Sequence, residues 1–200
     1  YWGQTVDDRV PQDAAMVAKA IRPDYALGGH TASLGLCWLP EGTLPCCGKV
    51  NRGVSIAGDT LYHGTHDAKL LALDAKTGRV KWETTVVDFK QGYALTHAPL
   101  IVRDKVIVGT AGGELGIRGF LAAYDAKTGK ELWRFKIIPE PGEKGNETWG
   151  GDSWKHGGGS IWVTGSYDPE TNLTYWGTCN PGPVWNPGMR PGDNLYSSGI

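Results

Sequence analysis

The sequence contains one internal repeat, and this repeat restricts the folds open to the chain more than any other feature. The segment "ALDAKTGRVKW" at residues 72–82 returns as "AYDAKTGKELW" at residues 123–133, with seven of the eleven positions identical. Each copy predicts a strand that ends in Asp, a turn through Lys-Thr-Gly, and a second strand that ends in Trp, because Gly supplies the positive φ that such a turn needs. The repeat therefore predicts two equivalent β-hairpins, each with a tryptophan at its far end.

Further strand patterns surround each hairpin. Residues 53–65 and 99–110 precede the two copies, and each segment has a turn between two apolar, β-branched runs. Two hairpins in a unit of about 50 residues make one four-stranded blade of a β-propeller. A third unit is predicted to open at residues 160–178, where a turn that contains Pro separates two strands. The 30 glycines and 9 tryptophans suit such an all-β fold of short strands, tight turns and large aromatic anchors.

The beginning of the chain does not fit this pattern. The stretch "DDRVPQDAAMVAKAIRP" at residues 7–23 places apolar residues at helical spacing, with Asp13 as a candidate N-cap, and so predicts one helix. We therefore divide the chain into an atypical N-terminal segment at residues 1–44 and a partial propeller at residues 45–200.

Charge and hydropathy exclude two classes of partner. Lys and Arg number 20 against 21 Asp and Glu, so no basic excess is available to hold a phosphate backbone, and no nucleic-acid partner is expected. The apolar runs are far shorter than the roughly 18 residues of a bilayer span, so no transmembrane segment is expected. The chain begins without Met and stops where a strand pattern starts, which leads us to expect a piece of a longer protein.

Five motifs, in order, carry a family resemblance. They are the paired cysteines before "VNRG", "THAP" at 96–99, "GTAGGE" at 109–114, "GGGSIW" at 157–162 and "CNPGPVWNPGMRPGDN" at 179–194. Together they resemble the alcohol dehydrogenases that use pyrroloquinoline quinone (PQQ), the methanol and ethanol dehydrogenase group. The two hairpins that end in Trp resemble the tryptophan-docking motifs of that family's eight-bladed propeller. The resemblance covers about residues 45–200 and does not extend to residues 1–44.

The resemblance implies a role for the adjacent cysteines. It implies that Cys46 and Cys47 form a disulfide with each other, and that this strained ring packs against one face of the quinone. A disulfide needs an oxidising compartment, so we expect a periplasmic location. The residues alone leave open the alternative that both are reduced thiols in a loop.

Other cofactor-binding residues are implied position by position. Arg52 matches an Arg that pairs with a quinone carboxylate. Thr96 and Ser160 match hydroxyl donors, and the family usually has Thr at the position of Ser160. Trp162 matches an indole that stacks on the quinone. The remaining implied cofactor residues are Ala111, Gly112 and Gly113, whose two glycines let the backbone approach the cofactor. Without the motif, Trp162 would be read as a core residue.

Two residues match the family's metal ligands. Glu114 and Asn180 are implied to hold a calcium or lanthanide ion against the quinone, and carboxylate and amide oxygens suit such hard cations. Taken alone, Glu114 in a Gly-rich loop would be a solvated turn residue. Cys179 departs from the family, which has Gly or Ser before the metal-ligand Asn.

The resemblance also implies a reaction. A primary alcohol would be oxidised to an aldehyde, with the metal as Lewis acid and an Asp as general base, and the electrons would pass to a cytochrome c. The family's Asp is expected beyond Ile200, so no catalytic residue is assigned and the isolated chain is expected to be inactive. A homo-oligomeric full-length protein is compatible with the resemblance. Two alternatives stay open: a non-catalytic propeller scaffold, and a PQQ-dependent sugar or polyol dehydrogenase.

Overall fold

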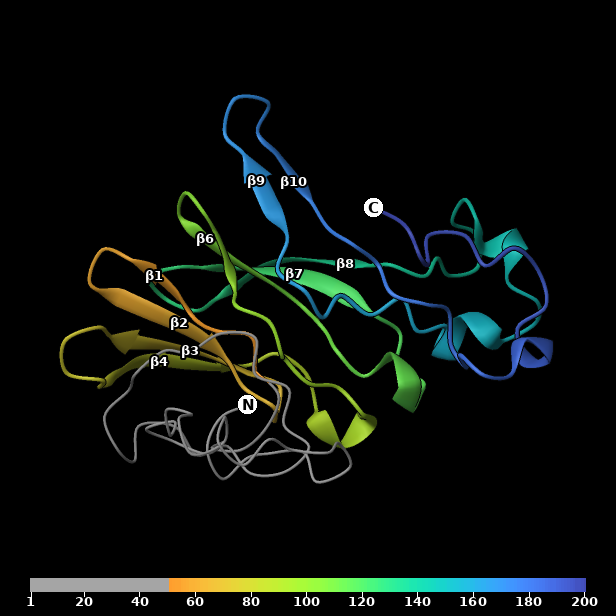
Figure 1. Cartoon of the computed structure of the whole chain (residues 1–200), viewed down its shortest axis with the longest axis horizontal. Coiled ribbons are helices and arrows are strands. Elements are labelled where there is room, and N and C mark those ends of the chain that lie inside the picture. Colours follow the sequence, from red (N-terminus) through yellow and green to blue (C-terminus); the bar gives the residue numbers. More distant parts are fainter. Residues whose placement is uncertain (1–50) are drawn as a thin grey trace, which may run out of the picture. The chain divides into compact units, whose positions relative to one another are not determined.

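The computed structural model describes residues 51–200, which form antiparallel β-sheets and short 3-10 helices (Figure 1). The predicted helix in residues 1–44, the predicted boundary at residue 45 and the cysteines Cys46 and Cys47 lie outside the described residues. Within residues 51–200, no helix has the length and apolar character needed to cross a membrane.

Two four-stranded antiparallel sheets contain the repeated hairpins, and in each sheet the strands pair in sequence order. The first sheet, which we call the first blade, consists of β1 (Ser55–Ala57), β2 (Thr60–Gly64), β3 (Lys69–Asp74) and β4 (Val80–Thr85). The second blade consists of β5 (Leu100–Val102), β6 (Lys105–Gly109), β7 (Phe120–Asp125) and β8 (Glu131–Lys136). The predicted two hairpins per repeat are confirmed.

The repeated turns have the same structure because the same short side chains stabilise them. In the first blade, a carboxylate oxygen of Asp74 accepts hydrogen bonds from the backbone N–H of Lys76 at 3.1 Å and of Thr77 at 2.8 Å. Asp125 makes the equivalent bonds in the second blade, at the same two distances. Gly78 follows with φ at 70°, a left-handed conformation that favours glycine. Local side-chain to backbone bonds therefore determine both turns.

The tryptophan of the first blade docks on the turn of the second. The indole N–H of Trp82 donates to the carbonyl oxygen of Ala126 at 3.0 Å, and the Tyr62 hydroxyl donates to the same oxygen at 3.0 Å. A Cβ atom at Gly129 would lie 2.5 Å from the Trp82 ring. The glycine of the turn is therefore required for its conformation and for the approach of the indole.

Alternate residues of β6 face the two apolar layers of the molecule. Val106 and Val108 belong to a cluster with residues of the first blade such as Leu70, whereas Ile107 belongs to a second cluster with Ile161 and later residues. This alternation follows from the period of two in a strand. Strand β6 is thus buried on both faces, against residues of the first blade and against residues that follow the second blade.

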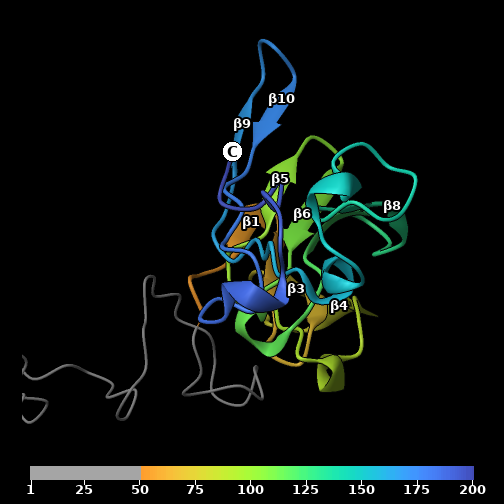
Figure 2. The same cartoon turned by 90° about the vertical axis from the view of Figure 1, so that its right-hand side faces the viewer.

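The predicted third unit contributes a two-stranded antiparallel hairpin, β9 (Ser166–Asp168) and β10 (Leu173–Tyr175). This hairpin projects from the rest of the described residues in both views (Figure 1 and Figure 2). Short 3-10 helices lie in the connections: η2 (Phe89–Gln91), η3 (Gly113–Leu115), η4 (Asn146–Thr148), η5 (Ser153–His156) and η6 (Pro187–Met189).

Candidate functional site

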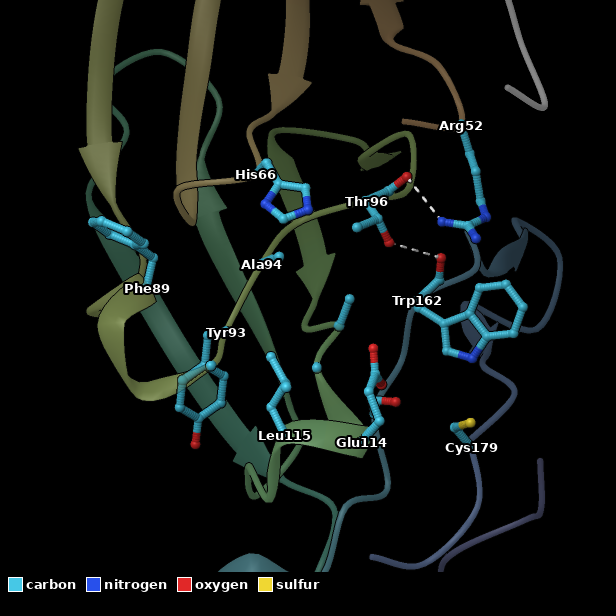
Figure 3. A pocket seen from close by; sticks show the side chains of 14 residues that line it. Arg52, His66, Phe89, Tyr93, Ala94, Thr96, Glu114, Leu115, Trp162 and Cys179 are labelled. Atoms are coloured by element: carbon cyan, nitrogen blue, oxygen red, sulfur yellow. Dashed lines mark hydrogen bonds between the residues drawn. The ribbon is translucent and has the colours of Figure 1, made fainter. Parts of the chain in front are cut away.

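A cavity of about 490 Å³ lies among the connections that precede or follow the strands (Figure 3). This volume is in the range of small-molecule and cofactor sites. Its walls come from segments that are far apart in the sequence. The lining residues are Arg52, His66, Phe89, Gly92, Tyr93, Ala94, Thr96, Ala111, Gly112, Glu114, Leu115, Ser160, Trp162 and Cys179.

The predicted cofactor residues are largely brought together in this cavity. Arg52, Thr96, Ala111, Gly112, Glu114, Ser160 and Trp162 all line it. Gly113 and Asn180 are not among the lining residues, although Gly113 packs on Ser160, where a Cβ atom would lie 2.9 Å from the hydroxyl oxygen. The Asn180 side chain instead accepts a hydrogen bond from the Ser198 hydroxyl at 3.3 Å.

Arg52 lines the cavity and contains one buried donor atom that has no partner in the described part of the chain. Its guanidinium lies over the Trp162 ring, 4.4 Å from the ring centroid, and one terminal N–H donates a long hydrogen bond of 3.4 Å to the Thr96 carbonyl. The Arg52 Nε is buried and has no hydrogen-bond partner among residues 51–200. Burial lowers the pKa of Arg52, but an arginine remains charged at any ordinary pH. A buried donor without a partner is costly, and the positive charge of the guanidinium as a whole would pair with a carboxylate ligand in the cavity.

The two hydroxyl residues occupy buried positions beside Arg52 and Trp162. Thr96 is 6% exposed, and its hydroxyl donates to the Trp162 carbonyl oxygen at 3.4 Å. Ser160 is 2% exposed, and its carbonyl oxygen accepts a hydrogen bond from the Cys179 N–H at 2.9 Å. Thr96 is therefore bonded to its neighbour through its side chain, and Ser160 through its backbone.

The glycine loop after β6 approaches its neighbours too closely for any side chain. Gly112 has a φ of 114°, and a Cβ atom there would lie 2.0 Å from the Gly92 carbonyl oxygen. The loop continues into η3, where Glu114 is exposed at the cavity wall (Figure 3). A single carboxylate is an incomplete metal site, and residues 51–200 contain no group of three or more His, Cys, Asp or Glu residues that could hold an ion. The metal-ligand roles of Glu114 and Asn180 therefore stay predictions.

Trp162 and Cys179 share the wall of the cavity that faces Glu114 in Figure 3. Trp162 is 38% exposed, which excludes the alternative that it is a core tryptophan. Cys179 is a free thiol of intermediate exposure and lines the cavity directly. The departure from Gly or Ser at this position thus places a sulfur atom inside the site.

Sequence reasoning missed the apolar part of the cavity. Phe89, Tyr93 and Leu115 line it, and so does His66, although no role in a site was predicted for any of these four residues. Leu115 adjoins Glu114, and Tyr93 lies between two other lining residues, Gly92 and Ala94. Proximity to the predicted ligands was the only available signal, because apolar side chains carry no chemistry of their own.

Comparison with known proteins identifies the family. Residues 85–200 match the PQQ family described as "Glucose/ethanol/alcohol dehydrogenase, beta-propeller domain". The quinoprotein alcohol dehydrogenase PedH of Pseudomonas putida is 47% identical over 176 residues, which cover 80% of this chain and 29% of PedH. Subunit 1 of the methanol dehydrogenase of Methylorubrum extorquens is 45% identical over 179 residues, which cover 78% of this chain and 28% of that protein.

A solved structure supports the same relationship. A europium-containing methanol dehydrogenase superposes with a TM-score of 0.67 at 40% identity, over 76% of this chain and 29% of that chain. The present chain therefore spans less than a third of the length of these relatives. The match to the family over more than half of the sequence shows that the chain belongs to the PQQ family of glucose/ethanol/alcohol dehydrogenase β-propeller domains.

Proposed function

We propose that the full-length protein is a PQQ-dependent dehydrogenase that oxidises a primary alcohol to an aldehyde, and that the cavity described above binds the quinone. The observation that carries this proposal is the gathering of Arg52, Thr96, Ser160, Trp162 and Glu114 around one cavity. These residues come from separate connections of the two blades and the third unit. A scaffold without cofactor has no reason to keep an unpaired buried Arg52 donor in such a place.

The described residues fit the chemistry of a flat, anionic ligand. The Arg52 guanidinium supplies a positive charge for a carboxylate, and the Ser160 hydroxyl supplies a neutral donor. The Thr96 hydroxyl would supply a second neutral donor on turning from the Trp162 carbonyl. The Trp162 indole supplies a flat apolar surface for a ring system, and Gly112 keeps the loop backbone close to the cavity. When bound, PQQ supplies the two-electron oxidation of an alcohol, and a bound calcium or lanthanide ion supplies Lewis acidity.

The remaining features of the proposal come from the family. Glu114 would contribute a carboxylate to the metal ion, with Asn180 as a second ligand once its amide turns from Ser198. Cys46 and Cys47 would form the disulfide on the quinone face opposite Trp162. We further propose a periplasmic location and transfer of electrons to a cytochrome c. A europium-containing relative supports a lanthanide as one candidate ion.

The test measures metal-dependent alcohol oxidation by the full-length protein, purified from a periplasmic fraction. The protein is supplied with PQQ and either calcium or lanthanum, and dye-linked ethanol oxidation is followed. Glu114→Gln is expected to weaken metal affinity by at least about 100-fold, since outer-shell changes alone cost 10- to 100-fold. Glu170→Gln, at an exposed position in the β9–β10 turn, is the matched control and should leave affinity unchanged. Turnover of glucose or a polyol but not of ethanol would favour the sugar dehydrogenase, and absence of any turnover would favour the scaffold.

A further inference from the structure

His97 lies next to three of the segments that line the cavity, those of Thr96, Ala111 and Trp162, although it does not line the cavity itself. Its side chain is 1% exposed. Its Nε2 lies 2.8 Å from the backbone nitrogen of Gly109, and its Nδ1 lies 2.7 Å from the carbonyl oxygen of Ala98. The edge of the Trp176 indole packs against the imidazole, with the ring centroids 5.9 Å apart.

These two contacts assign the charge and the tautomer of the imidazole. The Gly109 N–H is a donor, so Nε2 must accept, and the proton must lie on Nδ1, which donates to Ala98. A doubly protonated imidazole would lose the bond to Gly109. Burial, with a further contribution from the charge of Arg52, lowers the pKa of His97 and favours the neutral form.

The hydrogen bonds around His97 extend into three of the segments that line the cavity. Gly109 ends β6, and the next residue, Thr110, accepts a hydrogen bond through its carbonyl from the Ile161 N–H at 2.8 Å. The Ala98 carbonyl, which accepts from His97, also accepts from the Thr164 hydroxyl at 2.8 Å. The segments that carry Thr96, Ala111 and Trp162 are therefore joined within one or two residues of this imidazole.

We propose that His97 is a positioning residue of the cavity. Its neutral, Nδ1-protonated imidazole holds the end of β6 through the Gly109 N–H. In this way it sets the distance from Thr96 to the glycine loop, residues 111–114. This inference rests on the proposed function, because the ligand whose binding it controls is the quinone. His97 acts through the backbone and touches no ligand. A side chain of the wrong shape would leave the Gly109 N–H buried without a partner and would widen the cavity.

Two variants separate the two hydrogen bonds. His97→Gln places an amide oxygen near the position of Nε2 and keeps an acceptor for Gly109, whereas His97→Asn can reach only Ala98. In the full-length apo protein, PQQ is titrated at constant calcium and, separately, at constant lanthanum, and binding is followed by quenching of tryptophan fluorescence. We expect His97→Asn to raise the Kd for PQQ at least about 10-fold, as does the loss of hydrogen bonds that orient ligand-binding residues in other proteins. The Kd of His97→Gln should stay within about 3-fold of the parent's Kd.

Equal Kd values for the parent and both variants would overturn the proposal, and so would equal losses in both variants. A second measurement, on the parent protein, does not depend on PQQ binding. In protein labelled with 15N-histidine, the His97 signals, assigned by their absence in His97→Gln, should show the neutral Nδ1–H tautomer. An Nε2–H tautomer or a charged imidazole at pH 7 would overturn the proposal. If the parent itself binds no PQQ, the proposed function fails, and the NMR result still decides the hydrogen bonding of His97.

Discussion

The two blades have nearly the same backbone but differ in the environment of their repeated tryptophans. Both have a β-bulge at the equivalent place, after Ala72 and after Ala123, and both turns have the same Asp-centred hydrogen bonds. Yet Trp82 is half-buried against the turn of the second blade, whereas Trp133 is 41% exposed. All six residues of β8 are exposed, from Glu131 to Lys136.

This difference shows that the turn depends only on nearby residues, whereas the burial of the tryptophan depends on a neighbouring blade. The turn needs only its own five residues, so it forms in both blades. The docked tryptophan also needs a neighbouring turn with a free carbonyl and a glycine, which Ala126 and Gly129 provide for Trp82. The repeat therefore encodes the hairpin within each unit and the contact between units separately.

The largest expected effect on the free energy of unfolding comes from Trp82 and should be much smaller for Trp133. In the 200-residue chain, Trp82→Ala should lower the free energy of unfolding by about 3 kcal/mol, because it removes a large docked side chain and its hydrogen bond. Trp133→Ala should cost less than about 1 kcal/mol, as for other exposed positions. Urea unfolding followed by far-UV circular dichroism measures both. Equal losses would show that docking contributes nothing beyond the hairpin.

A second contrast lies in β2 and β6, where the first blade has buried His63 at the position of buried Val108 in the second. Burial lowers the pKa of His63 to about 4. Between pH 6.5 and pH 4 the unfolded state therefore binds a proton at His63 that the folded state does not bind. The free energy of unfolding is thus unaffected by His63 above pH 6.5 and falls as the pH drops from 6.5 toward 4. The loss should be about 2 kcal/mol between pH 7 and pH 5.

His63→Val, which copies the second blade, should remove this part of the pH dependence. The free energy of unfolding at pH 7 and pH 5 is compared for the parent and the variant. An unchanged pH dependence in the variant would mean that His63 is not the titrating group. Val108→Ala, which also disturbs a buried strand position but has no titrating group, is the control and should keep the parent's pH dependence.

The smallest expected effect concerns the two turns. Asp74→Asn and Asp125→Asn should both weaken their turns, because a carboxylate is the stronger acceptor for backbone N–H groups. Asp125→Asn should destabilise the chain more, since Trp82 docks on the turn that Asp125 holds. Urea midpoints measure the order of the two losses, and a larger loss for Asp74→Asn would contradict the docking explanation.

Most of the fold could be predicted because its signals are local. The repeat, its turns and the alternating strands indicated four strands per unit, as found. The β-bulges could not be predicted, because they depend on the register between paired strands. The exposure of Trp133 could not be predicted either, since its sequence context is the same as that of Trp82.

Part of the lining of the cavity was predictable, where family motifs coincide with ligand chemistry. Arg52, Thr96, Glu114 and Trp162 were found in this way, and they line one cavity. Phe89 and Leu115 were missed because an apolar residue gives no sign that it faces a site. His97 was missed because its role is to hold the backbone, and a hydrogen bond to Gly109 is visible only once β6 is placed beside it.

The central claim is that this cavity binds PQQ through Arg52. The most direct measurement is an absorption titration of the metal-loaded full-length protein with PQQ, for the parent and for Arg52→Ala. We predict saturation at one quinone per chain, and an affinity at least about 10-fold weaker in the variant, because the charged partner of the quinone carboxylate is lost. Failure to bind PQQ with either calcium or lanthanum, or equal binding by parent and variant, would contradict the claim.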